Sequence, residues 1–284
     1  MSRPTDAANE PVDDPDRPST HAARPLSAGD HPGPAADSAG RPWAGRAFEA
    51  NPHAADDGSA PPELAAAIAR FRSGDGGQAD VVAAFSAARL LIPLLAELGA
   101  GGAETGAHGL AVDKSQELSI VTVAGPDGRR VLPVFSSVAA MSAWNPSARP
   151  VPADGIRVAL AAADDGTDLV VLDPGSTGEF VLRRPAVWSV AQSRPWRPPF
   201  ESDEVVAAFA RSVDSELAVL GVDLLGGDPD ARLAGPELVV RLRLVAGLTR
   251  EELDAITARL ARRWAADDVI ATAVDSLTVR LIAG

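Results

Sequence analysis

Apolar residues with helical or strand spacing divide the chain after about residue 60 into a series of short elements. Helical spacing predicts two helices at the start of this region, one over 155–163 and one after Pro185. Prolines at Pro93 and Pro133 fall inside predicted strands, which favours edge or bulged strands there. The predicted strands are 89–96, 118–123, 129–135, 169–172 and 179–183. The second and third flank a Gly-Pro-Asp-Gly turn and predict an antiparallel hairpin, so the region is α+β.

The predicted strand that ends at Phe135 turns directly into a helix over 138–143. Ser136 or Ser137 can accept a hydrogen bond from the free N–H groups of that helix. Trp144 follows the helix, and its structural interpretation, like that of Phe135, is a core aromatic. The helix should bury a narrow face that includes Val138 and Met141, and the later helix should bury Ile156, Ala159 and Leu160.

A proline-rich segment over 194–201 is the clearest boundary in the chain, because prolines fall too often for a helix or a central strand. The residues after it, 202–284, predict a second small domain with the order α, β, β, α, β. Along 238–244, leucine and valine alternate with arginine, so this strand is predicted to be half-buried, with arginines on its other face. Thr249 and Glu252 form a capping box at the start of the longest predicted helix.

The first 60 residues have a different composition. Residues 1–40 contain almost no large apolar side chain, so they cannot offset the entropy of ordering and are predicted to be a disordered acidic leader. Trp43 and Phe48 interrupt this composition in 41–60. They predict an arm that is anchored on the first domain, 41–193, with a partner-binding linear motif as the alternative. The fold class is therefore α+β, with two small mixed α/β-sheet domains preceded by the leader.

Composition excludes several classes of function. The net charge of −13 argues against nucleic-acid binding, which relies on lysine and arginine. The chain has no cysteine, so disulfides, thiolate metal sites and cysteine nucleophiles are excluded. No apolar run reaches the length of a membrane span, and the N-terminus lacks the apolar segment of a signal peptide. We therefore expect a cytoplasmic protein without a membrane partner.

The order of the motifs resembles the N-terminal domain of the SseB family, the enhanced serine sensitivity proteins. The resemblance is carried by LPVFSS at 132–137, the short helix that ends in Trp144, a second helix and VVLDPGS at 170–176. It extends from about Trp43 to the C-terminus, because the last residues resemble the C-terminal domain of that family. It implies a fold and no mechanism, and no catalytic residue is carried over.

Catalytic constellations are missing from the sequence. The four histidines are His21, His31, His53 and His108, and none lies on a predicted apolar face. Ser176 is not in a G-x-S-x-G motif and has no evident base. The adjacent pair Arg183 and Arg184 has the pattern of ordinary surface charges. We therefore predict no catalytic residue, no metal site and no cofactor.

Two hypotheses from different classes follow. The first is a non-enzymatic protein-binding or regulatory module that uses its sheet edges, the acidic arm and the arginine face of 238–245 to bind a protein partner or a second copy. The second is a sensor for a small molecule, such as an amino acid, with a pocket between the domains. The candidate binding residues for that pocket are Phe135, Ser136, Trp144, Asp173, Gly175 and Ser176. An enzyme of unrecognised class is the remaining alternative.

Overall fold

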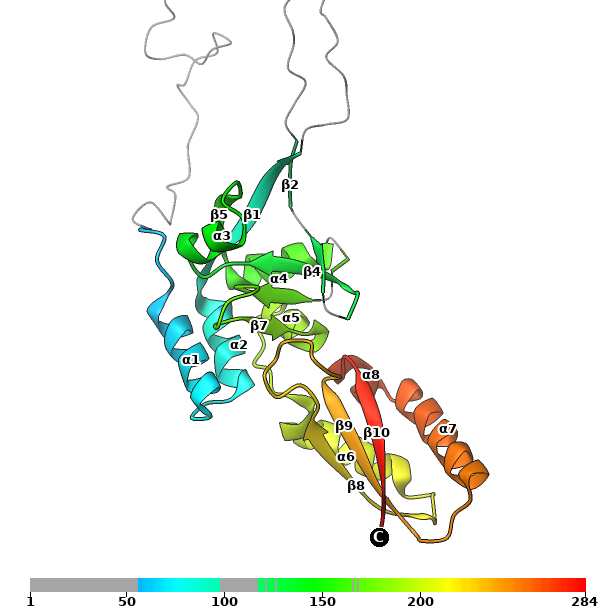
Figure 1. Cartoon of the computed structure of the whole chain (residues 1–284). Helices are drawn as coiled ribbons and strands as arrows, with labels where there is room; N and C mark the ends of the chain where they lie inside the picture. The colour runs from blue at the N-terminus through cyan, green and yellow to red at the C-terminus, as the bar shows by residue number, and fades with distance from the viewer. Residues whose placement is uncertain (1–55, 98–116, 121, 126, 165, 168) are drawn as a thin grey trace, which may run out of the picture. The chain divides into compact units, whose positions relative to one another are not determined.

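The computed structural model describes residues 56–97, 117–120, 122–125, 127–164, 166–167 and 169–284. These residues belong to one compact unit of the chain, His53–Gly284. The predictions for the leader and for most of the arm lie outside the described residues. We call residues 56–193 the N-terminal part and residues 202–284 the C-terminal part (Figure 1).

The N-terminal part mixes short helices with short strands, as the sequence predicts. Its helices are α1 (Pro62–Ser73), α2 (Gln78–Ala87), α3 (Val138–Trp144), α4 (Gly155–Asp164) and α5 (Arg184–Ala191). Its strands are β1 (Arg89–Glu97), β2 (Glu117–Ile120), β3 (Val123–Ala124), β4 (Arg130–Val134), β5 (Arg149–Asp154), β6 (Val170–Leu172) and β7 (Phe180–Leu182). The α+β class is confirmed.

The main sheet of the N-terminal part has the strand order β3-β4-β6-β7, and only the β4–β6 pair is parallel. Because side chains alternate along a strand, its two faces bury different residues. One face packs against the helices through Leu132, Val134, Val170, Leu172, Phe180 and Leu182. The other face buries Val131, Leu169, Val171 and Val181, together with Leu233 from the C-terminal part.

Pro133 lies in an interior strand whose register shows no bulge, so its prediction as an edge or bulged position is wrong. Leu132 donates its N–H to the Leu169 carbonyl, and Val134 accepts from the Asp173 N–H, so these two residues bond toward β6. The Pro133 nitrogen therefore faces the other side of β4, where β3 pairs only with Arg130 and Val131. A proline at such a position therefore removes no hydrogen bond between neighbouring strands.

Pro93 also lies in a central strand, because β1 runs between β2 and β5. Leu91 exchanges both of its backbone hydrogen bonds with Phe135, so the nitrogens of Leu91 and Pro93 point away from β5. Pro150 and Pro152 of β5 lie opposite Pro93 and Leu91, at positions where their nitrogens face outward. Strand β5 was not predicted, because prolines argue against a strand in the sequence. As an edge strand, β5 forms backbone hydrogen bonds with β1 only, so it tolerates prolines whose nitrogens face outward.

The predicted hairpin is confirmed only in part. Val123 and Ala124 pair with Val131 and Arg130 across the Gly125–Arg129 turn. The residues before them, Glu117–Ile120, pair instead with β1. Residues 118–123, predicted as one strand, therefore contribute to two different sheets.

Two apolar residues that were predicted to point inward, Leu160 and Val138, are exposed, and so is Leu220. Leu160 is 48% exposed, because the buried stripe of α4 is formed by Gly155, Val158, Ala159 and Ala162. Val138 is 39% exposed, although its N–H donates to the Gly58 carbonyl. Leu220, in the C-terminal part, is 55% exposed at a register irregularity between Val219 and Gly221.

The C-terminal part has the predicted order with one addition, the short helix α8. Its elements are α6 (Asp203–Val213), β8 (Val219–Gly226), β9 (Leu238–Leu244), α7 (Arg250–Ala266), α8 (Asp268–Ala273) and β10 (Leu277–Ala283), and a 3-10 helix, η1 (Pro199–Glu201), precedes them in the proline-rich segment. The strand order is β10-β9-β8, with β9 parallel to β10 and antiparallel to β8. The strands run side by side with α6 behind them (Figure 1). The capping box of Thr249 and Glu252 is present at the start of α7.

The connection between β8 and β9, residues 227–237, reaches into the N-terminal part. The Ala231 carbonyl accepts from the Val181 N–H at 2.8 Å, and Ala231 belongs to the helix-side core. Leu233 lies on the opposite face of the same sheet. We call this segment the β8–β9 connection. Through it, the two parts share buried residues.

Candidate functional site

Ser136 and Asp173 meet as the sequence suggests. They follow the parallel neighbours β4 and β6, so the ends of these strands bring them together. The Ser136 backbone N–H donates to Asp173 Oδ1 at 2.8 Å, and Ser136 Oγ donates to Oδ2 at 2.6 Å. Burial raises the pKa of Asp173, and the two hydrogen bonds from Ser136 oppose that rise. These two hydrogen bonds link the end of β4 to the end of β6.

Phe135 and Trp144 pack as core aromatics. Phe135 is fully buried, and its ring centroid lies 5.3 Å from that of Trp144, with a tilt of 42° between the planes. Leu91 and Met141 complete this cluster. The Phe135 side chain is therefore surrounded by other protein atoms and offers no surface to a ligand.

Gly175 and Ser176 form the turn between β6 and β7. Gly175 has a φ of 77°, in the left-handed region that favours glycine, and its N–H donates to Glu179 Oε2 at 2.6 Å. Ser176 Oγ accepts from the Gly178 N–H at 3.1 Å. Both residues have a structural role in the turn. With Ser136 and Asp173 only 7% and 6% exposed, the predicted small-molecule pocket has no opening at its central pair.

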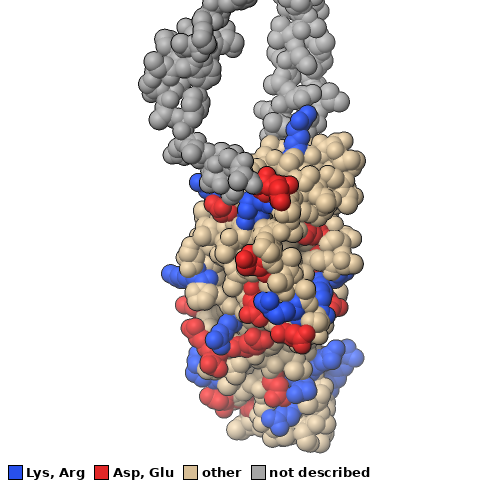
Figure 2. All heavy atoms as spheres, turned by 90° about the vertical axis from the view of Figure 1, so that its left-hand side faces the viewer, with Lys and Arg blue, Asp and Glu red and all other residues tan. Residues whose placement is uncertain are grey.

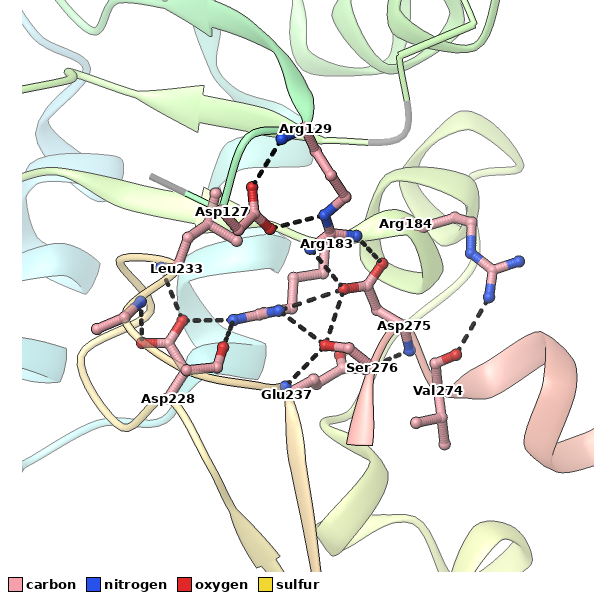
Figure 3. Close-up of polar contacts among 12 residues, drawn as sticks. Asp127, Arg129, Arg183, Arg184, Asp228, Leu233, Glu237, Val274, Asp275 and Ser276 are labelled. Carbon is pink, nitrogen blue, oxygen red and sulfur yellow. Dashed lines mark hydrogen bonds and ion pairs between the residues drawn. The ribbon is translucent and has the colours of Figure 1, made fainter. Parts of the chain in front are cut away.

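A second polar cluster, which we call the Arg183 cluster, joins the two parts of the chain (Figure 3). Arg183 follows β7 and is 7% exposed, so its prediction as a surface charge is wrong. One end of its guanidinium donates to Asp228 Oδ2 and to the Gly235 carbonyl, both at 2.7 Å. The other end donates to Asp275 Oδ2 at 3.2 Å and to Ser276 Oγ at 3.1 Å. All four of these acceptors belong to the C-terminal part.

Asp228 is the acceptor that orders the β8–β9 connection. Besides Arg183, its carboxylate accepts from the backbone N–H groups of Arg232, Leu233 and Ala234. Ala231 and Leu233 have φ values of 49° and 57°, a left-handed conformation that is strained for residues with a side chain. The bonds to Asp228 hold the connection in that conformation.

Asp275 is shared between two arginines. Arg129 donates to both of its carboxylate oxygens, at 2.9 and 3.0 Å, and Arg183 makes the third contact. Burial alone would raise the pKa of Asp275, but its hydrogen bonds and the charges of Arg129 and Arg183 hold the pKa below its usual value. The pKa of Arg129 is raised by the same pair. Asp275 is therefore an ionised partner within the cluster.

Glu237 behaves in the opposite way. It is 6% exposed, and burial raises its pKa to about 7, helped by the nearby charge of Asp275. Its Oε2 accepts from the Asp275 N–H at 2.6 Å, a bond that opposes the rise. Glu237 is the group in this cluster whose charge changes near neutral pH.

The sheet of the C-terminal part has one covered face and one open face. The covered face packs Leu238, Val240, Leu242 and Leu244 against α6, α7 and α8. The residues that alternate with these and their register partners form what we call the open sheet face. It consists of Gly221, Asp223 and Leu225 of β8, Arg241 and Arg243 of β9, and Thr278, Arg280 and Ile282 of β10, whereas Val239, on the same side, is buried at 7% exposed.

The open sheet face carries three arginines and one carboxylate. Asp223 lies 3.2 Å from Arg241 and 3.9 Å from Arg243, and the side chains of the two arginines are 40% and 49% exposed. The guanidinium of Arg243 lies over Gly221, where a Cβ would come within 2.5 Å of it. Arg280 has no hydrogen bond or ion pair among the described residues. This face therefore has a formal charge of +2.

That charge contrasts with the rest of the molecule. On the side shown in Figure 2, basic and acidic side chains are interspersed, and the whole chain has a net charge of −13. In the part of the chain that the structure describes, no helix has the length and apolar character to cross a bilayer. Across the same ranges, no group of three or more carboxylate or imidazole side chains could hold a metal ion.

Comparison with protein families matches the N-terminal part. Residues 64–189 match the model described as the SseB protein N-terminal domain. The N-terminal part is SseB-like. The match includes β4, α3 and the Ser136–Asp173 pair, and it ends before the C-terminal part. Searches of curated proteins and of solved structures gave no match.

The SseB match bears on the predicted site in a limited way. For residues 64–189 it confirms the resemblance to the SseB N-terminal domain that LPVFSS and VVLDPGS suggest, and the structure shows that these segments are adjacent strand ends. The likeness of residues 202–284 to the C-terminal domain of the family stays a prediction. The Arg183 cluster was missed because its members lie far apart in the sequence, and the only local signal was Arg183 directly after an apolar strand.

Within this SseB-like region, Ser136→Ala is expected to lower the free energy of unfolding by about 1–3 kcal/mol. The change leaves Asp173 Oδ2 buried without its hydroxyl donor, while the backbone N–H still bonds Oδ1. Urea unfolding measures the loss. Ser142→Ala, at an exposed position of α3, is the matched control and should leave the midpoint nearly unchanged. Equal midpoints for both variants would contradict a stabilising role for the Ser136 hydroxyl.

Proposed function

We propose that the protein is a non-enzymatic protein-binding module whose open sheet face receives an acidic, extended segment of a partner protein. The observation that carries the proposal is the placement of Arg241, Arg243 and Arg280 on an uncovered sheet face with Asp223 as the one carboxylate. Leu225 and Ile282, 39% and 38% exposed, add apolar surface at its border. A partner segment with alternating acidic and apolar side chains fits this combination.

Charge complementarity favours an acidic partner. The face is cationic on a chain whose net charge is −13, so an acidic segment is attracted here and repelled by most of the remaining surface. Such contacts contribute mainly to orientation and association rate, and salt weakens them. Nucleic acid is a poorer fit, because three arginines are a small footprint against that overall charge.

The candidate residues in the N-terminal part support a role without chemistry. Asp173 is occupied by the two bonds from Ser136, and Ser176 Oγ is occupied in its own turn. A nucleophile needs a base within hydrogen-bond reach and access to substrate. The burial of Ser136 and Asp173 leaves the pair without that access.

The test compares two charge-reversal variants of the full chain that carry the same change in net charge. Arg243→Glu with Arg280→Glu reverses the open sheet face, and Arg250→Glu with Arg262→Glu reverses two exposed positions on α7. The probe is a fluorescein-labelled peptide of alternating glutamate and valine, with a lysine–valine peptide as its opposite. Fluorescence anisotropy at low salt measures binding.

We expect the acidic peptide to bind the wild-type chain and the α7 variant equally, and the face variant at least about tenfold more weakly. Raising the salt concentration to about 0.5 M should remove most of the binding. Proteins captured from a native lysate should be lost with the face variant and released by the acidic peptide. Equal binding by both variants, or equal binding of the lysine peptide, would reject the proposal.

A further inference from the structure

A pocket lies where the proline-rich segment passes between the two parts of the chain. It has a volume of about 310 Å³ and is lined by α5, by residues 194–197, by the start of α6 and by the end of α8. This volume is at the lower end of the range for small-molecule sites, roughly 300–1,000 Å³. We call it the linker pocket. Its chemically distinctive side chains are those of Trp188, Gln192, Arg194, Trp196 and Arg197.

The sequence accounts for this concentration of side chains. Helix α5 ends at Ala191, and Ser193 follows with a left-handed φ of 54°. The Arg194 N–H then donates to the Ser189 carbonyl, which turns the chain back along the helix. Prolines at 195, 198 and 199 restrict the backbone of the segment to extended conformations, and Arg194, Trp196 and Arg197 all line the pocket. Trp196 packs against the core of the N-terminal part.

The two tryptophans give the pocket aromatic surface. Trp188 is 44% exposed, which is unusual for so large an apolar side chain, and the Arg184 guanidinium lies 5.9 Å from the centre of its ring. Arg184 is in turn held by the Ala271 and Val274 carbonyls, so it fixes Trp188 from one side. Trp196 is half-buried. A planar ring can stack on these indoles.

The two arginines give the pocket an unneutralised positive charge. Arg194 and Arg197 are exposed, and neither side chain has a hydrogen bond or an ion pair among the described residues. In an acidic chain, two unpaired guanidinium groups beside two indoles are a specific combination. Guanidinium groups bind carboxylates with paired, geometrically matched hydrogen bonds.

We propose that the linker pocket binds a small planar aromatic carboxylate, with its ring against Trp188 and Trp196 and its carboxylate on Arg194 and Arg197. This site shares no residue with the open sheet face, so the proposal for the linker pocket and the proposal for the sheet face are tested independently. A ligand held there contacts α5 of the N-terminal part and α6 and α8 of the C-terminal part at the same time. Its binding therefore favours the arrangement in which both parts contact the linker.

A neighbouring hollow is a weaker candidate for the same ligand. It has a volume of about 460 Å³, lies on the side of α2 and shares Arg194, Trp196 and Arg197 with the linker pocket. It lacks Trp188 and is lined by the carboxylate of Asp80, which repels an anion. The linker pocket is therefore the site that suits an aromatic anion.

The test uses three matched probes with the full chain. Indole-3-carboxylate has the ring and the charge, indole-3-carboxamide has the ring alone, and cyclohexanecarboxylate has the charge alone. The chain contains five tryptophans, so ¹H–¹⁵N spectra give a small set of indole N–H signals to follow. Replacing Trp188 and Trp196 singly by phenylalanine assigns their two signals.

We expect indole-3-carboxylate to shift the Trp188 and Trp196 signals with a dissociation constant on the order of 1 mM, as for a fragment-sized ligand. The signals of Trp144 and Trp264, in their separate core clusters, should not move. The amide and the cyclohexane acid should bind about tenfold more weakly. Arg194→Gln with Arg197→Gln should abolish the preference for the acid, whereas Arg250→Gln should retain it.

Each contrary result removes a defined part of the proposal. If about 10 mM indole-3-carboxylate leaves the Trp188 and Trp196 signals unmoved, the pocket is not a site for aromatic acids. If acid and amide bind equally, the arginines do not recognise a carboxylate. These spectra also report whether each variant is folded. If a variant loses binding because it unfolds, all of its indole N–H signals change together, and this is seen directly.

Discussion

Replacement of Arg183 by alanine is expected to lower the free energy of unfolding by about 3–5 kcal/mol. Arg183 is 7% exposed and bridges Asp228 and Asp275, whose side chains are 3% and 2% exposed. Removing the guanidinium leaves buried carboxylates without their positive partner, and this cost exceeds the gain from forming the pair in the first place. Guanidinium chloride unfolding followed by circular dichroism measures the loss.

Arg250→Ala provides the matched control for this variant. Its side chain is 93% exposed and lies 3.9 Å from Asp254, so its removal should change the free energy by less than about 0.5 kcal/mol. A loss below about 1 kcal/mol for Arg183→Ala would mean that water or a rearranged Arg129 satisfies the carboxylates. Arg129→Ala distinguishes these cases, because Arg129 is the other donor to Asp275.

Replacement of Glu237 by glutamine is expected to stabilise the protein, and the gain should depend on pH. Burial raises the pKa of Glu237 from 4.5 to about 7, so the folded state favours the neutral carboxyl. The stability from the neutral form is complete below pH 4.5 and is lost as pH rises through about 7. Glutamine has no proton to lose and can still accept from the Asp275 N–H.

The two proteins should therefore have similar stability near pH 4, and the variant should be more stable by about 3 kcal/mol at pH 8. Taking the difference between wild type and variant removes the contribution of other groups, including Asp275, whose pKa is shifted downward. Urea unfolding at a series of pH values gives this difference directly. A difference that stays constant between pH 4 and pH 8 would show that Glu237 does not titrate in this range.

Local signals predicted much of the fold. Pro185 at the first turn of α5, the capping box at Thr249 and the alternating apolar residues of 238–244 each correspond to an element of the structure. The Ser136–Asp173 pair could be anticipated in part, because both residues directly follow predicted strands. These features depend on interactions within a few residues or on a shared strand end.

The rest depends on contacts between distant residues. Arg129, Arg183, Asp228 and Asp275 each look like a turn or surface charge when only their neighbours are considered. Arg183 and Asp228 are buried because the β8–β9 connection folds onto a sheet that is formed about 50 residues earlier, and Asp275 meets Arg129 and Arg183 from another segment of the C-terminal part. The prolines of β1, β4 and β5 were misjudged for a related reason. Which side of a strand needs a free N–H is decided by its neighbours in space.

The β8–β9 connection has a consequence for how the sequence can change. The loop that joins two antiparallel strands is commonly the place where a protein tolerates insertions and deletions. Here, Ala231 and Leu233 fill two separate cores of the preceding part, and Asp228 fixes the spacing between them. A change of one residue in its length would displace both side chains at once. Variation in length should therefore accumulate elsewhere on the surface, and this loop should keep the same number of residues.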